Sequence, residues 1–161
     1  MDERDAVTSA LGASWFGAGL SIHARARLAD CAALREYPAG TALLREGDET
    51  ALFAVVARGR VALRMLVPER GPVTILTVEP GDVVGWSAIV PPNRSTSTAI
   101  TIEPTELLVF EPRQLRALLE ADLALAATLY PRLLEAIGRR LGATRNQLLD
   151  LYAQQAEPVP W

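Results

Sequence analysis

The chain has 161 residues, of which 50% are hydrophobic, and a formal net charge of −3 at pH 7. These values fit one domain that can bury a real core, and they exclude disorder of most of the chain. The mildly acidic balance, in which all 16 basic residues are arginine, gives no sign of a nucleic-acid-binding surface.

The compartment is indicated by the cysteine content and by the N-terminus. A single cysteine, Cys31, excludes an internal disulfide and fits a reducing compartment. Residues 1–5 are acidic and precede no long apolar run, so we expect no signal peptide. No stretch reaches the ~18 apolar residues that a membrane helix needs. We therefore expect a cytoplasmic protein that does not enter a membrane.

The first part of the chain has helical patterns. Residues 5–18 contain two glycines and predict a short helix followed by a loop. Ser21 is a good N-cap, and the apolar positions that follow predict a helix from Ile22 to about residue 32, with Ile22 on its apolar face.

The middle of the chain has the two-residue period of strands. Val61, Leu63, Met65 and Val67 alternate with less apolar residues, whereas residues 51–57 are apolar throughout and predict a strand buried on both faces. Glycine or proline turns separate the expected strands at residues 41–45, 51–57, 60–67, 73–78, 97–102 and 107–110, with a short apolar step at 83–84. This spacing predicts an antiparallel β-barrel or jelly roll over residues 33–111.

From residue 112 to residue 152 the pattern is helical again. We expect a short helix with Pro112 in its first turn, then a long C-terminal helix over 122–152, kinked or broken at Pro131. Arg139, Arg140 and Arg145 are interpreted as its solvent-exposed face. The fold class is thus mainly β with flanking helices, in one domain of residues 1–152, and residues 153–161 are predicted to be a flexible tail.

A heptad pattern follows Pro131 on the long helix. The apolar steps alternate between three and four residues, with the small polar Thr144 in the series. A dimer interface is favoured over packing within the chain, because few elements remain to cover this face. The predicted homodimer interface consists of Leu134, Ile137, Leu141, Leu148 and Leu151.

The segment of residues 79–99 is the candidate binding site. A turn and Val83-Val84 lead to Gly85, which lets a bound group approach the backbone, and a short helical turn after it would present free N–H groups. With nearby hydroxyls and an arginine, this favours a cradle for a phosphate or carboxylate. The candidate ligand-binding residues are Gly85, Trp86, Ser87, Ala88, Arg94, Ser95 and Thr96.

Each of these residues also has an ordinary structural explanation. Trp86 is placed in the pocket, although a core position would also suit it, and Arg94 is either an anion ligand or a solvated loop residue. Cys31 is interpreted as a small core residue, because no neighbouring base would activate it. His23 is the sole histidine and is assigned to the surface, so we expect no metal site and no cupin-type catalytic metal.

The glycine positions carry a family resemblance. Gly40 and Gly47 flank a strand, Gly59 lies in a hairpin, Gly81-Asp82 forms a turn, and Gly85 opens the candidate site. With the order of elements, residues 16–152 resemble the cyclic nucleotide-binding domain, the sensor half of the catabolite activator family. The resemblance implies the same fold, a phosphate-binding cassette that begins at Gly85, and pairing through the long helix.

Two positions depart from the family pattern. The family places a glutamate for the ribose directly after the cassette glycine, where this chain has Trp86, and an arginine for the cyclic phosphate ten residues after it, at Ser95. Arg94 stands one position early, and in an extended segment one residue turns a side chain to the other face. We therefore expect weak or absent cAMP binding. The family's helix-turn-helix is also missing after the long helix, so no direct DNA binding is expected.

The sequence thus predicts a non-catalytic regulatory sensor module with a degenerate phosphate-binding cassette. Its ligand would be a small anion, with a weakly bound cyclic nucleotide included, and it would need no cofactor. The alternative is a ligand-free dimeric module of the same fold that binds a protein partner. No catalytic set of residues supports an enzyme.

Overall fold

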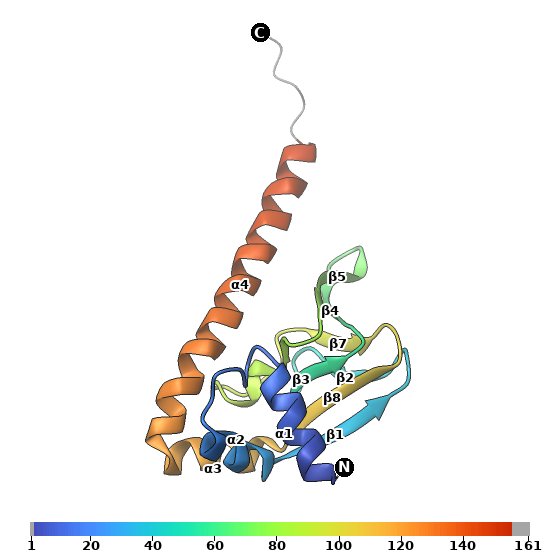
Figure 1. The fold of residues 1–161 in the computed structure, drawn as a ribbon. Helices are drawn as coiled ribbons and strands as arrows, with labels where there is room; N and C mark the ends of the chain where they lie inside the picture. The colour runs from blue at the N-terminus through green and yellow to red at the C-terminus, as the bar shows by residue number, and fades with distance from the viewer. Residues whose placement is uncertain (1, 156–161) are drawn as a thin grey trace.

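The computed structural model describes residues 2–155 (Figure 1). Two helices come before the strands and two after them. The helical elements are α1 (Glu3–Ala13), α2 (Ile22–Ala29), the 3-10 turn η1 (Trp86–Ala88), α3 (Pro112–Ala121) and α4 (Leu123–Gln155). The strands are β1 (Ala32–Tyr37), β2 (Ala42–Leu44), β3 (Phe53–Arg58), β4 (Val61–Val67), β5 (Gly71–Val78), β6 (Val83–Val84), β7 (Thr98–Thr101) and β8 (Thr105–Phe110).

The strands form two four-stranded antiparallel sheets, in the orders β1-β8-β3-β6 and β2-β7-β4-β5. The sequence allowed either a barrel or a jelly roll over residues 33–111. The two separate sheets correspond to the jelly roll, and the predicted mainly β class with a long C-terminal helix is confirmed. Each strand expected between residues 41 and 110 is present within a few residues.

The sheet that contains β3 lies between two hydrophobic cores. Ala54 and Val56 face the second sheet, where they pack with Val61 and other buried residues. Phe53 faces the helices, and its ring lies 5.4 Å from that of Phe16 and 5.6 Å from that of Phe110, centroid to centroid. Burial on both faces explains why residues 53–56 are apolar without alternation.

The N-terminal helices begin largely as expected, but α2 is shorter. The hydroxyl of Ser21 accepts a hydrogen bond from the Ala24 N–H at 3.1 Å, which caps α2. The helix ends at Ala29 because Ala32 already pairs with Phe110 at the start of β1, so the predicted extension to residue 32 is wrong. Ile22 is 83% exposed and does not lie on a buried face, which corrects its assignment.

The sequence predicted a kink or a break at Pro131, and the C-terminal helix α4 is continuous through this residue, so the break is wrong. Leu125, Leu129 and Leu133 are buried against the helix-side core, whereas residues 144–154 are all exposed. The helix extends to Gln155, so residues 153–155 of the predicted tail are helical, and residues 156–161 lie outside the described part. Among the described helices, none is long and apolar enough to cross a bilayer.

Candidate functional site

The cassette begins at Gly85, where the backbone conformation would be strained in any residue with a Cβ atom. It has φ +78°, and a Cβ atom there would overlap the carbonyl oxygen of Leu52 in the neighbouring segment. Glycine therefore brings β6 close to the start of β3 and starts η1, in which the Ala88 N–H donates to the Gly85 carbonyl at 2.9 Å. The short helical turn expected after Gly85 is present.

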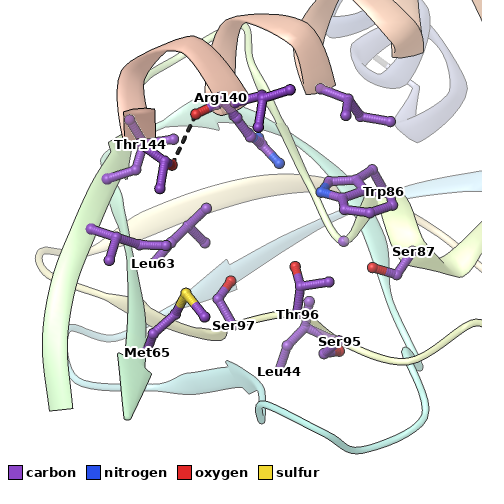
Figure 2. Close-up of a pocket in the computed structure, with 15 residues that line it drawn as sticks. Leu44, Leu63, Met65, Trp86, Ser87, Ser95, Thr96, Ser97, Arg140 and Thr144 are labelled. Atoms are coloured by element: carbon purple, nitrogen blue, oxygen red, sulfur yellow. Dashed lines mark hydrogen bonds between the residues drawn. The ribbon is translucent and has the colours of Figure 1, made fainter. Parts of the chain in front are cut away.

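A cavity of about 280 Å³ lies beside this cassette, between the β2-β7-β4-β5 sheet and α4. Figure 2 shows hydroxyls of the segment after Arg94 on one side and α4 on the other. Most of its wall is apolar. The lining residues are Leu44, Leu63, Met65, Ile75, Leu76, Gly85, Trp86, Ser87, Ser95, Thr96, Ser97, Ile137, Arg140, Leu141 and Thr144.

Five of the seven predicted ligand-binding residues line this cavity: Gly85, Trp86, Ser87, Ser95 and Thr96. Ala88, the last residue of η1, is fully buried and does not line it. Its carbonyl oxygen instead accepts hydrogen bonds from Nη1 of Arg116 at 2.6 Å and from Nδ2 of Asn93 at 3.2 Å. Ala88 therefore shapes the turn and offers no group to a ligand.

Arg94 also lies outside the cavity lining. Its side chain is exposed, and Nη1 donates to the carbonyl oxygen of Gly47 at 2.8 Å. Ser95, one residue on, is buried, with its hydroxyl 3.0 Å from that of Thr50. Ser95, the family's arginine position, therefore lines the cavity, whereas Arg94 does not.

The sequence reasoning missed the contribution of α4 to this cavity. Arg140 was interpreted as solvent-exposed, but only 12% of its side chain is exposed, so that interpretation is wrong. Arg139, its neighbour, is half exposed, with its guanidinium carbon 4.4 Å from the ring centroid of Trp15. Arg140 is three residues after Ile137 and four before Thr144, so the three share one helix face. This spacing could have indicated from the sequence that Arg140 lies beside Ile137.

The residues of the predicted dimer interface are divided between two environments. Ile137 is half-buried against the core. Ile137 and Leu141 both line the cavity. Four leucines of the stripe are solvent-exposed: Leu134 (68%), Leu141 (70%), Leu148 (52%) and Leu151 (47%). Residues 2–155 therefore leave most of this stripe uncovered.

The described residues offer few side chains that could bind a metal ion or act as a nucleophile. Within residues 2–155, no group of three or more His, Cys, Asp or Glu side chains is arranged to hold a metal ion. His23 is exposed, as expected. Cys31 is half-buried, and burial raises the pKa of its thiol, with Asp30 adding to the effect, so the unreactive thiol form is favoured.

Comparison with known proteins identifies the family of this fold and site. The model of the cyclic nucleotide-binding domain matches residues 34–122, so the chain belongs to the cyclic nucleotide-binding domain family. It is 31% identical over 128 residues to the Pycsar effector protein XpPycTIR of Xanthomonas perforans. That match covers 76% of this chain but only 38% of the effector, so the chain spans about two-fifths of this relative's length.

Solved structures show the same fold at low sequence identity. A cyclic nucleotide-binding domain from Methylobacillus flagellatus KT is similar with a TM-score of 0.78 and 18% identity, over 98% of this chain and 86% of that one. The regulatory subunit of a cAMP-independent protein kinase A from Trypanosoma brucei is similar with a TM-score of 0.71 and 15% identity, over 92% of this chain and 52% of that one. The protein in that structure is a triple mutant bound to cAMP, and one of its substitutions replaces threonine with arginine.

Proposed function

We propose that this chain is a non-catalytic regulatory domain, over residues 1–152, that senses a small anionic ligand in the cavity beneath α4. The observation that carries the proposal is the composition of the cavity, which takes residues from the β2-β7-β4-β5 sheet, the cassette and α4. A ligand held there contacts the sheet and the helix together. Its binding therefore favours one position of α4 relative to the strands, which is how a ligand selects one conformation of a sensor.

The cassette is proposed to be degenerate for cyclic nucleotides. Trp86 stands where the family has its ribose-binding glutamate, and Ser95 stands where it has its phosphate-binding arginine. Arg94 does not replace that arginine, since its guanidinium is bonded to the Gly47 carbonyl outside the cavity.

We expect the parent chain to bind cAMP weakly or not at all, and a Trp86→Glu/Ser95→Arg variant to bind it much better. Each restored charge-assisted hydrogen bond is worth ~1.5–3 kcal/mol, so the gain is about 10²–10⁴-fold in affinity. Isothermal titration calorimetry measures the affinity of the parent and of the variant for cAMP. Arg94→Ala is the control and should change nothing. A low-micromolar parent that loses cAMP on Arg94→Ala would show that Arg94 has taken over the phosphate.

A stability screen separates the sensor from its alternative. The alternative is a ligand-free homodimer that binds a protein partner in the cytoplasm, and the exposed leucines of α4 favour it. Thermal unfolding is measured with cyclic mononucleotides, cyclic dinucleotides and simple organic anions, because a ligand that binds the native state raises its stability. A rise with any of these supports the sensor, and a dimer that responds to none supports the alternative.

A further inference from the structure

Arg140 is a buried arginine, and two of its donor atoms lack a hydrogen-bond partner within residues 2–155. Its side chain is 12% exposed and extends from α4 beside Trp86 at the cavity (Figure 2). Within residues 2–155, its Nε and Nη2 atoms are buried and make no hydrogen bond. An unsatisfied buried donor costs free energy, and more so when it is charged, so a group of this kind calls for a functional explanation.

The nearest carboxylate compensates this charge only in part. Oδ1 of Asp82 lies 3.8 Å from Nη2 of Arg140, which is too long for a hydrogen bond. The same oxygen accepts the Val83 N–H at 2.8 Å and lies 3.7 Å from Nη2 of Arg139. Burial lowers the pKa of Arg140, more than Asp82 raises it, which is the direction expected for a cation without a full counter-ion.

The other walls of the cavity define what would complete this site. Among the described residues that line it, Arg140 alone carries a charge. Ser95, Thr96 and Ser97 offer hydroxyls on the side opposite α4, as Figure 2 shows. The remaining wall is largely aliphatic, contributed by β2, β4, β5 and α4. One negative group beside Arg140, attached to an apolar body, matches this distribution.

We propose that Arg140 is the anion-binding residue of this cavity and that the ligand is an apolar organic anion, a carboxylate or a phosphate ester. This inference rests on the proposed sensor function and specifies its ligand. The anion is then bound from α4, whereas the family places its phosphate-binding side chain at the position of Ser95. A carboxylate or phosphate then pairs with the guanidinium of Arg140, while the aliphatic part lies along Leu63 and Ile75.

The test compares charged and neutral probes of one shape. Octanoate, octyl phosphate and neutral 1-octanol are titrated by calorimetry into the full chain and into Arg140→Met, which keeps an unbranched apolar stem and removes the guanidinium with its charge. Octanoate or octyl phosphate should bind the parent and weaken by about 10–100-fold in the variant, because a charge-assisted pair is lost. Arg140→Lys should be intermediate, since it keeps the charge without the fork of donors. Arg139→Met is the matched control and should bind like the parent.

The stability of the ligand-free variants gives a second readout. Arg140→Met should be at least as stable as the parent, because it removes two unsatisfied buried donors. A larger loss of thermal stability than in Arg139→Met would overturn the proposal, since Arg140 would then serve the fold through Asp82.

Binding outcomes distinguish this inference from the sensor function. If octanol binds like octanoate and Arg140→Met changes neither, the assignment of Arg140 is wrong and a ligand-binding cavity remains. The same holds if only cyclic nucleotides bind and Arg140→Met does not affect them. If neither the octyl probes nor any compound of the stability screen binds, both the inference and the sensor function fail.

Discussion

Gly85→Ala should destabilise the protein by about 2–5 kcal/mol, because two costs add at one position. The φ of +78° is unfavourable for any residue with a Cβ, and the added methyl group would overlap the Leu52 carbonyl oxygen. Relief requires β6 to move away from the start of β3, which disrupts the cassette and the core behind it. Chemical denaturation followed by tryptophan fluorescence measures the loss.

Gly40→Ala separates the two costs. Gly40 has φ +81°, close to that of Gly85, but a Cβ there would meet nothing within 4 Å. Its substitution should therefore cost only the backbone term, about 1–2 kcal/mol. If Gly85→Ala costs no more than Gly40→Ala, the contact with Leu52 is relieved at little expense, and the close approach at the cassette is not what requires glycine.

Leu148→Asp should convert the proposed homodimer into a monomer. Leu148 is 52% exposed, belongs to the leucine stripe of α4 and does not line the cavity, so the variant tests association without altering the ligand site. Burying one leucine side chain is worth ~1.5–3 kcal/mol, and a symmetric dimer has two copies. The dissociation constant of the dimer should therefore rise by about 10²–10⁴-fold. Light scattering at tens of micromolar reports the mass.

Asn146→Asp provides the matched control for this experiment. It adds the same negative charge two residues away, at an exposed position on the opposite side of the heptad. It should leave the dimer intact. A parent chain that is monomeric at tens of micromolar contradicts the proposed interface, and the exposed leucines would then need another partner.

Local periodicity was enough to predict most elements of the fold. The alternation of Val61 and Leu63 with their neighbours comes from the side-chain geometry of a single strand, and both residues are buried in β4. The end of α2 was harder to predict. Residues 30–32 suit a helix by composition, but Ala32 pairs with Phe110 of β8, and such a distant partner leaves no mark on the local pattern.

The candidate site was predicted on the cassette side and missed on the helix side. Ser95 and Thr96 follow Gly85 by only ten and eleven residues, so an argument along the sequence found them. Arg140 looked like part of a polar run with Arg139, and only the placement of α4 against β5 buries one arginine and leaves the other half exposed. Burial of this kind depends on tertiary packing, which a helical pattern does not specify.

Pro131 gives α4 a place where bending is easy. Proline has no N–H, so the Ala127 carbonyl lacks its usual donor four residues ahead, and the turns before and after Pro131 are joined by one hydrogen bond fewer. The helix from there to Gln155 is about 36 Å long at ~1.5 Å per residue, and it carries the cavity residues first and the leucine stripe beyond them. A tilt of roughly 10° at Pro131 would therefore displace the far end by about 6 Å, about two to four times as far as it displaces the cavity residues of α4. A bend next to the core at Pro131 would thus move Arg140 at the cavity a short distance and, within the leucine stripe, would move Leu151 the furthest.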